Sequence, residues 1–253
     1  MTGSRIVAII PARMGSSRLP GKPLADICGR PMIIRVIERV HQLGCCSEVV
    51  VATDSREILE CVRLSGYEAV LTSAHHPSGT DRIAEAALSM GFEPDDVVVN
   101  VQGDQPFVKA EMVHAVVNAL VEDDGVSMST VACPVSETEA RNPNRVKVVL
   151  DNNSCALFFS RSLIPFDRDG VFADQDSPYL RHLGIYAYRM SFLQEFVKMP
   201  MGRLEAIEKL EQLRALENGF RIAVKIVPSA PVDVDTEDDL EEARRISRKE
   251  CQA

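Results

Sequence analysis

Short apolar runs alternate with amphipathic stretches along most of the chain. Four runs rich in Val and Ile have the length of buried strands, at residues 6–10, 49–52, 69–71 and 97–101. Between them, apolar residues recur at helical spacing, as Ile33, Val36, Ile37 and Val40 do. This spacing predicts helices that begin at Pro31 and that cover residues 56–65, 81–90 and 110–121.

The second half of the chain has a less regular pattern. It predicts strands at residues 146–150, 156–159, 184–188 and 222–227. A helix over 204–218 is ended by Gly219 as its left-handed cap, and a last helix over 236–246 has Thr236 as N-cap. Together the elements predict an α/β protein with a doubly wound, mainly parallel sheet. We expect a single domain over residues 1–253 that carries a small β-rich insertion near 152–190.

This insertion is rich in apolar side chains and poor in helical periodicity. The residues concerned are Phe158, Phe159, Leu163, Ile164, Phe166, Val171 and Phe172. They predict a homodimerisation surface, since two-fold dimers are the commonest homo-oligomers. The alternative is a lid that folds its apolar side chains inward.

Charge and cysteine content narrow the class of protein. The formal net charge of −9 over 253 residues argues against nucleic acid or an anionic membrane surface as a partner. The apolar run before Pro11 is too short to span a membrane and lacks the layout of a signal peptide, so we expect a cytoplasmic protein. The seven cysteines are scattered and are expected to be reduced thiols. Cys45 and Cys46 leave a metal or redox pair as the alternative.

The loop after the first strand, residues 11–24, has the parts of a phosphate cradle. It combines glycines and two serines with Arg13, Arg18 and Lys22, which suit a triphosphate. A solvated basic loop is the alternative interpretation. Five residues separate Gly15 from Gly21 and a proline follows Lys22, so the loop is not a Walker A motif. It also lacks the G-x-G-x-x-G pattern of dehydrogenases.

Two aspartates follow predicted strands. Asp104 comes after the strand at 97–101, and Asp235 precedes the last helix. If the two strand ends are neighbours, these carboxylates can share Mg²⁺; taken singly, each suits a turn or a helix cap. The D-x-D patterns 233–235 and 167–169 would also fit a metal-dependent glycosyltransferase, although so short a pattern is weak.

The first loop resembles the signature of the sugar-acid cytidylyltransferases, in particular the CMP-Kdo synthetase (3-deoxy-manno-octulosonate cytidylyltransferase) family. Further segments resemble that family in the same order, at residues 51–54, 78–82, 99–104, 142–144, 146–151, 159–161, 181–186, 210–214 and 234–236. The resemblance implies a nucleotide-diphospho-sugar transferase-like fold. It also implies transfer of CMP from CTP to a 3-deoxy-octulosonate-type sugar acid, release of pyrophosphate, a role in lipopolysaccharide synthesis, and a homodimer.

The resemblance also implies roles for single residues. Mg²⁺ would be held by Asp104 and Asp235, and these act in catalysis with Lys22 and Arg13. The nucleotide side would comprise Ala12, Arg13, Gly15, Ser16, Arg18, Lys22, Thr53, Ser78, Gly79, Arg82 and Gln102. The sugar side would comprise Gln102, Arg161, His182, Tyr186, Glu211 and Gln212.

Four positions depart from the commonest pattern of the family. Gln105 stands where Glu is frequent, His75 where Asp is, Asp233 where Gly is and Phe166 where Trp is. Gln105 removes an acidic group near the expected metal site, which leaves the 8-amino analogue of the sugar open as the substrate. A metal-dependent glycosyltransferase and a non-catalytic nucleotide-binding regulator remain the competing functions.

Overall fold

The computed structural model describes residues 4–16, 18–173 and 175–250. Ser17 of the first loop and Cys251 lie outside this range. The chain divides into two compact units, Met1–Ala110 with Pro231–Ala253, and Glu111–Ala230. The single domain over residues 1–253 therefore stays a prediction.

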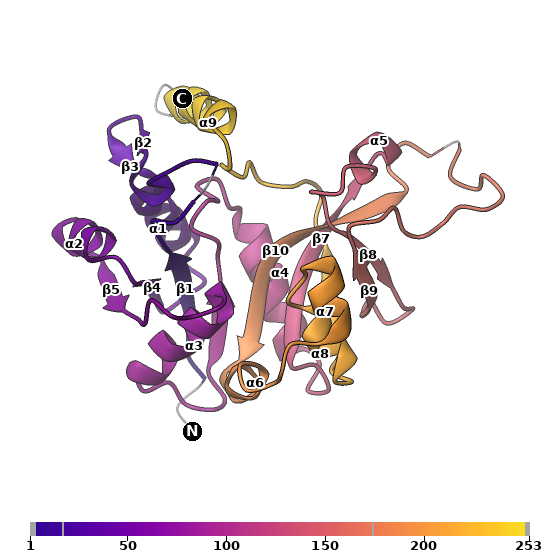
Figure 1. The fold of residues 1–253 in the computed structure, drawn as a ribbon, viewed down its shortest axis with the longest axis horizontal. Coiled ribbons are helices and arrows are strands. Elements are labelled where there is room, and N and C mark those ends of the chain that lie inside the picture. The colour runs from indigo at the N-terminus through magenta and orange to yellow at the C-terminus, as the bar shows by residue number, and fades with distance from the viewer. Residues whose placement is uncertain (1–3, 17, 174, 251–253) are drawn as a thin grey trace. The chain divides into compact units, whose positions relative to one another are not determined.

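The first unit has a parallel sheet with β1 (Ile6–Ala12) at its centre. β1 pairs with β6 (Val97–Asn100) on one side and with β4 (Glu48–Thr53) on the other, and β5 (Glu68–Leu71) follows β4 (Figure 1). Because every strand runs the same way, their carboxyl ends meet at one edge, where ligands bind in such sheets. The four strands predicted in this half of the chain are confirmed.

Three helices connect these strands, and serine caps set the first residues of two of them. α1 (Met32–Leu43) buries the predicted apolar face, including Ile33 and Val36. Ser55 and Ser78 cap α2 (Arg56–Leu64) and α3 (Gly79–Ser89) with their hydroxyl oxygens. The cap at Ser78 explains why α3 begins two residues before its predicted start.

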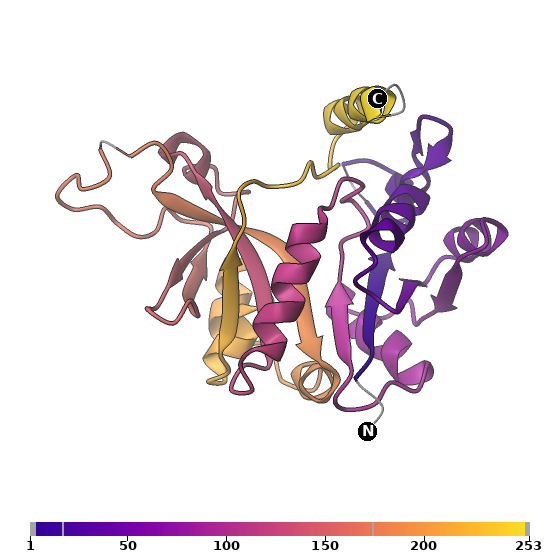
Figure 2. The ribbon, with the colours of Figure 1, turned by 180° about the vertical axis from the view of Figure 1, so that it is seen from behind.

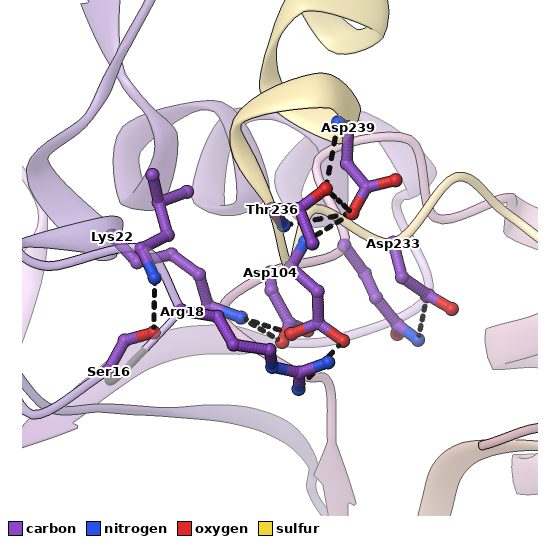
Figure 3. Close-up of polar contacts among 10 residues, drawn as sticks. Ser16, Arg18, Lys22, Asp104, Asp233, Thr236 and Asp239 are labelled. Atoms are coloured by element: carbon purple, nitrogen blue, oxygen red, sulfur yellow. Dashed lines mark hydrogen bonds and ion pairs between the residues drawn. The ribbon is translucent and has the colours of Figure 1, made fainter.

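Thr236 caps α9 (Glu237–Glu250), as predicted. Asp239 N–H donates to its hydroxyl at 3.2 Å, and the Asp239 carboxylate accepts from Thr236 N–H at 2.9 Å (Figure 3). Between β1 and α1 the first loop also forms a short 3-10 turn (Lys22–Leu24) and a small hairpin, β2 (Asp26–Ile27) and β3 (Arg30–Pro31), which the sequence pattern did not predict.

The second unit is built on β7 (Met128–Val135), which the sequence pattern also missed. β7 pairs in parallel with β11 (Ile222–Ile226) and antiparallel with β10 (Tyr179–Arg189). β8 (Lys147–Leu150) pairs antiparallel with β10 and with β9 (Ala156–Ser160). α4 (Ala110–Val121) covers one face of this sheet (Figure 2), and α7 (Arg203–Glu208) and α8 (Leu213–Glu217) lie on the other.

The predicted helix over residues 204–218 is wrong, because the chain breaks it in two. α7 (Arg203–Glu208) ends at Lys209, which takes the left-handed conformation with φ 54° and ψ 46°, and α8 (Leu213–Glu217) follows. Gly219, with φ 80°, does follow the end of α8 as predicted. Two further short helices, α5 (Glu137–Ala140) and α6 (Met190–Phe196), were not predicted.

The segment near 152–190 contains both core and exposed residues. β10 is a core strand of the second unit, and Phe159 is fully buried. Phe166 and Val171, in contrast, are 84% and 71% exposed in the long loop between β9 and β10. A dimerisation or lid role for this segment stays a prediction.

Two findings bear on the predicted compartment. Within the described ranges, every helix is too short or too polar to cross a lipid bilayer. The six cysteines that the structure describes are free thiols, and the Sγ atoms of Cys45 and Cys46 lie 3.9 Å apart.

Candidate functional site

A pocket of about 400 Å³ lies in the first unit at the carboxyl ends of its strands. All of the residues predicted to bind the nucleotide lie in the described part of the chain, and each except Thr53 lines this pocket. Asp104 and Asp235 line it too. The fold thus gathers residues that are more than two hundred positions apart in the sequence.

Two glycines let the backbone come close at this edge. A Cβ atom at Gly103 would lie 3.1 Å from the Pro11 carbonyl oxygen, a tighter contact than side chains normally make. Gly21 takes a left-handed conformation with φ 69°, which turns the chain so that Lys22 enters the pocket. Gly103 therefore lets two backbone segments of the pocket wall come close, and Gly21 sets the direction in which Lys22 leaves the turn.

Lys22 lies between the two aspartates. Its Nζ donates to Asp104 Oδ2 at 2.6 Å and to Asp235 Oδ1 at 3.0 Å (Figure 3), and Arg18 lies 3.2 Å from the other oxygen of Asp235. Burial alone would lower the pKa of Lys22, but the Asp104 and Asp235 carboxylates outweigh it and raise that pKa. Lys22 is therefore protonated near neutral pH, and the Asp104 and Asp235 carboxylates both contact its ammonium group.

Asp235 reaches Asp104 by a route that differs from the one predicted. β11, the strand before it, pairs with β7 in the second unit and not with β6. Instead, the segment before α9 is anchored by Val234, whose N–H donates to the Asp104 carbonyl at 2.9 Å. Val234 is fully buried in an apolar cluster with Leu19 and Leu240. This cluster joins the first loop to the start of α9 and so brings the two aspartates together.

The missing acidic group at Gln105 has a counterpart. Gln105 is buried, and its Nε2 donates to Asp233 Oδ1 at 3.0 Å. The two departures from the family pattern therefore contact each other. Gln105 replaces a frequent Glu, and the Asp233 carboxylate beside it supplies an acidic group in the same place. No group of three or more His, Cys, Asp or Glu side chains that could hold a metal ion is found in the described ranges.

Thr53 and Arg82 are held by neighbours within the unit. Thr53 is fully buried and its hydroxyl accepts from Ser55 N–H, so its contact with a nucleotide stays a prediction. Arg82 lines the pocket, but it is 4% exposed and donates to Thr72 Oγ1 at 2.6 Å and Asp54 Oδ2 at 2.9 Å. Arg82 thus supports the pocket wall through these two contacts.

His76 lines the pocket and was missed by the sequence analysis. Its ring pairs with Glu85 on α3. A hydrogen bond from Ser73 N–H, together with His76, holds the pKa of Glu85 below its usual value. The signal that could have found His76 is its place two residues before Ser78, in a segment already singled out.

In the second unit, His182 and Tyr186 lie on β10 on either side of a bulge. His182 pairs with Ala132 and Tyr186 with Thr130, so β10 advances four residues while β7 advances two. The two rings lie 5.3 Å apart, and Nε2 of His182 is 3.0 Å from Thr130 Oγ1. The irregular pairing brings both predicted residues to one place.

The ionisation of both side chains is set by burial. Burial, helped by the neighbouring Arg181, lowers the pKa of His182 to about 3. Burial also raises the pKa of Tyr186 well above its usual value. Near neutral pH both side chains are therefore uncharged, and they can offer a ligand hydrogen bonds but no charge.

The remaining predicted sugar-side residues of this unit lie at the end of β9 and at the break between α7 and α8. Arg161 donates from Nε to the Glu208 carbonyl at 2.8 Å, and Glu211 lies 3.8 Å from Arg214. Gln212 is 5% exposed, and its Nε2 finds no hydrogen-bond partner among the residues that the structure describes. Gln102, the sixth predicted residue, lines the pocket of the first unit.

The pocket of the first unit brings glycines, cations and two carboxylates together at the carboxyl ends of parallel strands. The fold and this pocket define the class of the nucleotidyltransferases. The model of the family described as cytidylyltransferase matches residues 7–226, and the chain belongs to this family. A 3-deoxy-manno-octulosonate cytidylyltransferase of Syntrophobacter fumaroxidans is 54% identical over 239 residues, 94% of this chain and 94% of that one.

Two further relatives give the same picture. A protein of the same name from Acinetobacter baumannii is 49% identical over 240 residues, 92% of this chain and 94% of that one. A solved structure of CMP:2-keto-3-deoxy-manno-octonic acid synthetase complexed with CTP is 40% identical, with a TM-score of 0.91 over 98% of this chain and 100% of that chain. This likeness confirms the predicted α/β class with its mainly parallel sheet.

Proposed function

We propose that this protein transfers CMP from CTP to 3-deoxy-manno-octulosonate and releases pyrophosphate, which would supply the activated sugar for lipopolysaccharide synthesis. The observation that carries the proposal is the cluster of Lys22, Asp104 and Asp235 in the lining of a pocket that also holds glycines and two arginines of the first loop. The name and the bound CTP of the solved relative support the choice of nucleotide and sugar.

The basic residues of the pocket account for the phosphate chemistry. Arg13, Arg18 and Lys22 hold the triphosphate and offset the charge that grows on its oxygens during the displacement. The anomeric hydroxyl oxygen of the sugar forms a new bond to the α-phosphorus while the bond to pyrophosphate breaks. The hydroxyl proton leaves to solvent. The cations of the first loop thus stabilise the leaving group as well as the bound substrate.

Mg²⁺ is the proposed cofactor, held by Asp104 and Asp235. The fit rests on the two carboxylates, which lie 2.6 and 3.0 Å from a single cationic atom, Lys22 Nζ. Carboxylate oxygens together with phosphate oxygens are the ligands that Mg²⁺ prefers. When bound, Mg²⁺ neutralises phosphate charge and makes the attacking hydroxyl more acidic.

The sugar acid is proposed to contact the buried, uncharged groups of the second unit. His182 and Tyr186 supply hydrogen bonds, and the Nε2 of Gln212 is a donor ready for a ligand oxygen. Arg161 and Glu211 complete the part of the proposed sugar side that lies in this unit, and a sugar contact of Gln102 in the first unit stays a prediction. In this proposal, the charged phosphates of CTP are bound by the cations that line the pocket of the first unit.

Homodimer formation and a cytoplasmic location are part of the proposal. The exposed Phe166 and Val171 support a surface that a second copy would cover, and the free thiols suit a reducing compartment. Light scattering at micromolar concentration should give twice the 27.9 kDa mass of one chain. A mass of one chain, unchanged by ligand, would reject the dimer.

The function is tested by pyrophosphate release with each of the four nucleoside triphosphates and a panel of sugar acids. We expect release with CTP and 3-deoxy-manno-octulosonate, and none with CTP alone. A clear preference for the 8-amino analogue would change the sugar and keep the reaction. Absence of pyrophosphate with every pair, together with transfer from a preformed nucleotide sugar, would favour a glycosyltransferase. CTP binding without any turnover would favour a regulator.

A further inference from the structure

The second unit contains a fully buried lysine. Lys147, at the start of β8, is 0% exposed, and its ammonium donates to the carbonyl oxygens of Asn142 at 3.1 Å, Arg145 at 2.6 Å and Arg161 at 2.6 Å. An ammonium group has three N–H donors, so each of them is used. Burial, helped by the nearby Arg161 guanidinium, lowers the pKa of Lys147. Burying an ammonium group costs free energy of folding even when it is hydrogen-bonded, so a buried lysine is expected to serve a purpose.

Lys147 holds one side of Arg161, and Glu208 holds the other. The Glu208 carboxylate accepts from Arg161 N–H at 2.9 Å and from the Ser160 hydroxyl at 2.5 Å. The backbone of Arg161 is therefore fixed at its carbonyl by Lys147 and at its N–H by Glu208. Two buried or half-buried charges thus set the position of a single residue at the end of β9.

The Arg161 side chain in turn donates hydrogen bonds to the chain at the break between α7 and α8. Its Nε donates to the Glu208 carbonyl at 2.8 Å, its Nη2 to the Lys209 carbonyl at 3.4 Å and its Nη1 to the Pro143 carbonyl at 3.2 Å. Glu208 and Lys209 are the residues where α7 ends and the chain turns left-handed. Arg161 therefore ties down the carbonyls that the helix end leaves without partners within the helix.

The residues that follow this turn carry the sugar-side chemistry. Gln212 comes three residues after the left-handed Lys209 and begins α8 as its N-cap. Its side chain is 5% exposed, and its Nε2 has no partner among the described residues. A buried donor in this state is usually satisfied by a ligand or by water. Where that donor points depends on the turn that Arg161 holds.

We infer that Lys147 and Glu208 are positioning residues for the sugar acid. They hold Arg161 and, through it, the turn at residues 209–212, so that the Gln212 amide faces the sugar with a fixed orientation. Neither side chain touches a substrate or a reacting atom. The inference rests on the proposed function and adds to it a cause for the geometry of the sugar side.

The test compares Lys147→Met with Lys225→Met in steady-state turnover of CTP and 3-deoxy-manno-octulosonate. Methionine keeps the apolar stem but leaves three carbonyls without a donor, so the turn at 209–212 should lose its fixed position. We expect the KM for the sugar acid to rise at least tenfold and the KM for CTP to stay within twofold. Lys225 is a partly exposed lysine of the same unit that pairs with Glu122, and its variant should match the wild type.

Glu208→Gln provides the milder variant, should Lys147→Met fail to fold. The amide can keep a hydrogen bond to Arg161 N–H and to the Ser160 hydroxyl but carries no charge, so the charge-assisted contacts of the Glu208 carboxylate become weaker. We expect the same selective rise in the KM for the sugar acid, about threefold or more, with a melting temperature close to that of the wild type.

Two results would overturn the inference. In a folded variant, an equal change in the KM for CTP and for the sugar acid would make the cluster a general structural support. An unchanged KM for both would show that the turn is fixed without it. Failure of the proposed function is a separate outcome, because the wild-type protein would then release no pyrophosphate from CTP with any sugar acid.

Discussion

The pocket of the first unit and the region around His182, Tyr186 and Arg161 in the second unit differ in the charge that they can offer a ligand. In the pocket, Arg13 and Arg18 are exposed and Lys22 is protonated between two carboxylates. In the second unit, His182 and Tyr186 are uncharged near neutral pH. The charged Arg161 side chain donates three hydrogen bonds to backbone carbonyls. Charge acts over several ångströms and tolerates small shifts, whereas a hydrogen bond from a buried group does not. The two regions should therefore respond differently to substitution.

The largest expected effect lies at the two carboxylates. Asp104→Asn or Asp235→Asn should lower kcat by roughly a hundredfold or more with the fold intact, because each removes a carboxylate that would hold the proposed Mg²⁺ and, with it, the stabilisation of the phosphate charge. Turnover at saturating Mg²⁺, with circular dichroism as a check of folding, measures this. Asp169→Asn, at the exposed D-x-D pattern, is the matched control and should behave as the wild type. Near-normal turnover of both pocket variants would refute the metal assignment.

Lys22→Met should act on the nucleotide side alone. Loss of one charge-assisted contact is worth about 1.5–3 kcal/mol, so the affinity for CTP should fall roughly tenfold or more. Titration calorimetry with CTP and with the sugar acid separates the two sides, and Lys249→Met on α9 controls for the loss of a lysine. If sugar binding falls instead, the first loop does not hold the triphosphate.

The first unit followed from its sequence because local rules decide it. Its strands are short runs of mainly apolar residues, and Ser55, Ser78 and Thr236 are ordinary helix caps. Glycines and cations then gather at the strand ends by the topology of a parallel sheet. The hairpin of β2 and β3 and the place of His76 were missed. The route to Asp235 was missed as well, since it depends on the burial of Val234 among residues distant in sequence.

The second unit followed only in part from local rules, which predicted strands that overlap β8, β9, β10 and β11 but not β7 or the break at Lys209. β7 contains Ser129, Thr130 and Pro134 and shows no simple apolar run, yet it is a core strand because β10 and β11 pair with both of its edges. The 204–218 segment consists of good helix formers, so nothing local marks Lys209 as a break. The break is held by tertiary contacts from Arg161 to the carbonyls around it.

His182 gives a pH-dependent test of the buried region. Its folded pKa of about 3 lies below the usual 6.5, so between these values the unfolded chain binds more protons than the folded one. The free energy of unfolding should therefore fall as the pH drops from 6.5 towards 3, by up to about 1.4 kcal/mol per pH unit from this residue. His182→Gln should flatten that slope in urea unfolding, whereas His114→Gln, at an exposed position on α4, should not. An unchanged slope in His182→Gln would mean that the ring is protonated when folded.

The smallest expected effect is that of Asp233→Asn, which compares two neighbouring aspartates of the first unit. Asp233 and Asp235 are two residues apart, but Asp233 accepts from the Gln105 amide while Asp235 contacts the cations Lys22 and Arg18. Asparagine at 233 keeps the oxygen that Gln105 needs, so Asp233→Asn should change kcat less than about threefold, in the range of weak polar contacts.

The contrast between the two aspartates also separates two kinds of enzyme. If the 233–235 segment were the D-x-D motif of a glycosyltransferase, both carboxylates would serve the metal, and Asp233→Asn would be as damaging as Asp235→Asn. Measured side by side for pyrophosphate release, a hundredfold loss at 235 with a small one at 233 supports the cytidylyltransferase geometry. Equal losses would move the metal site to the whole segment, and Gln105 would then hold a metal ligand in place.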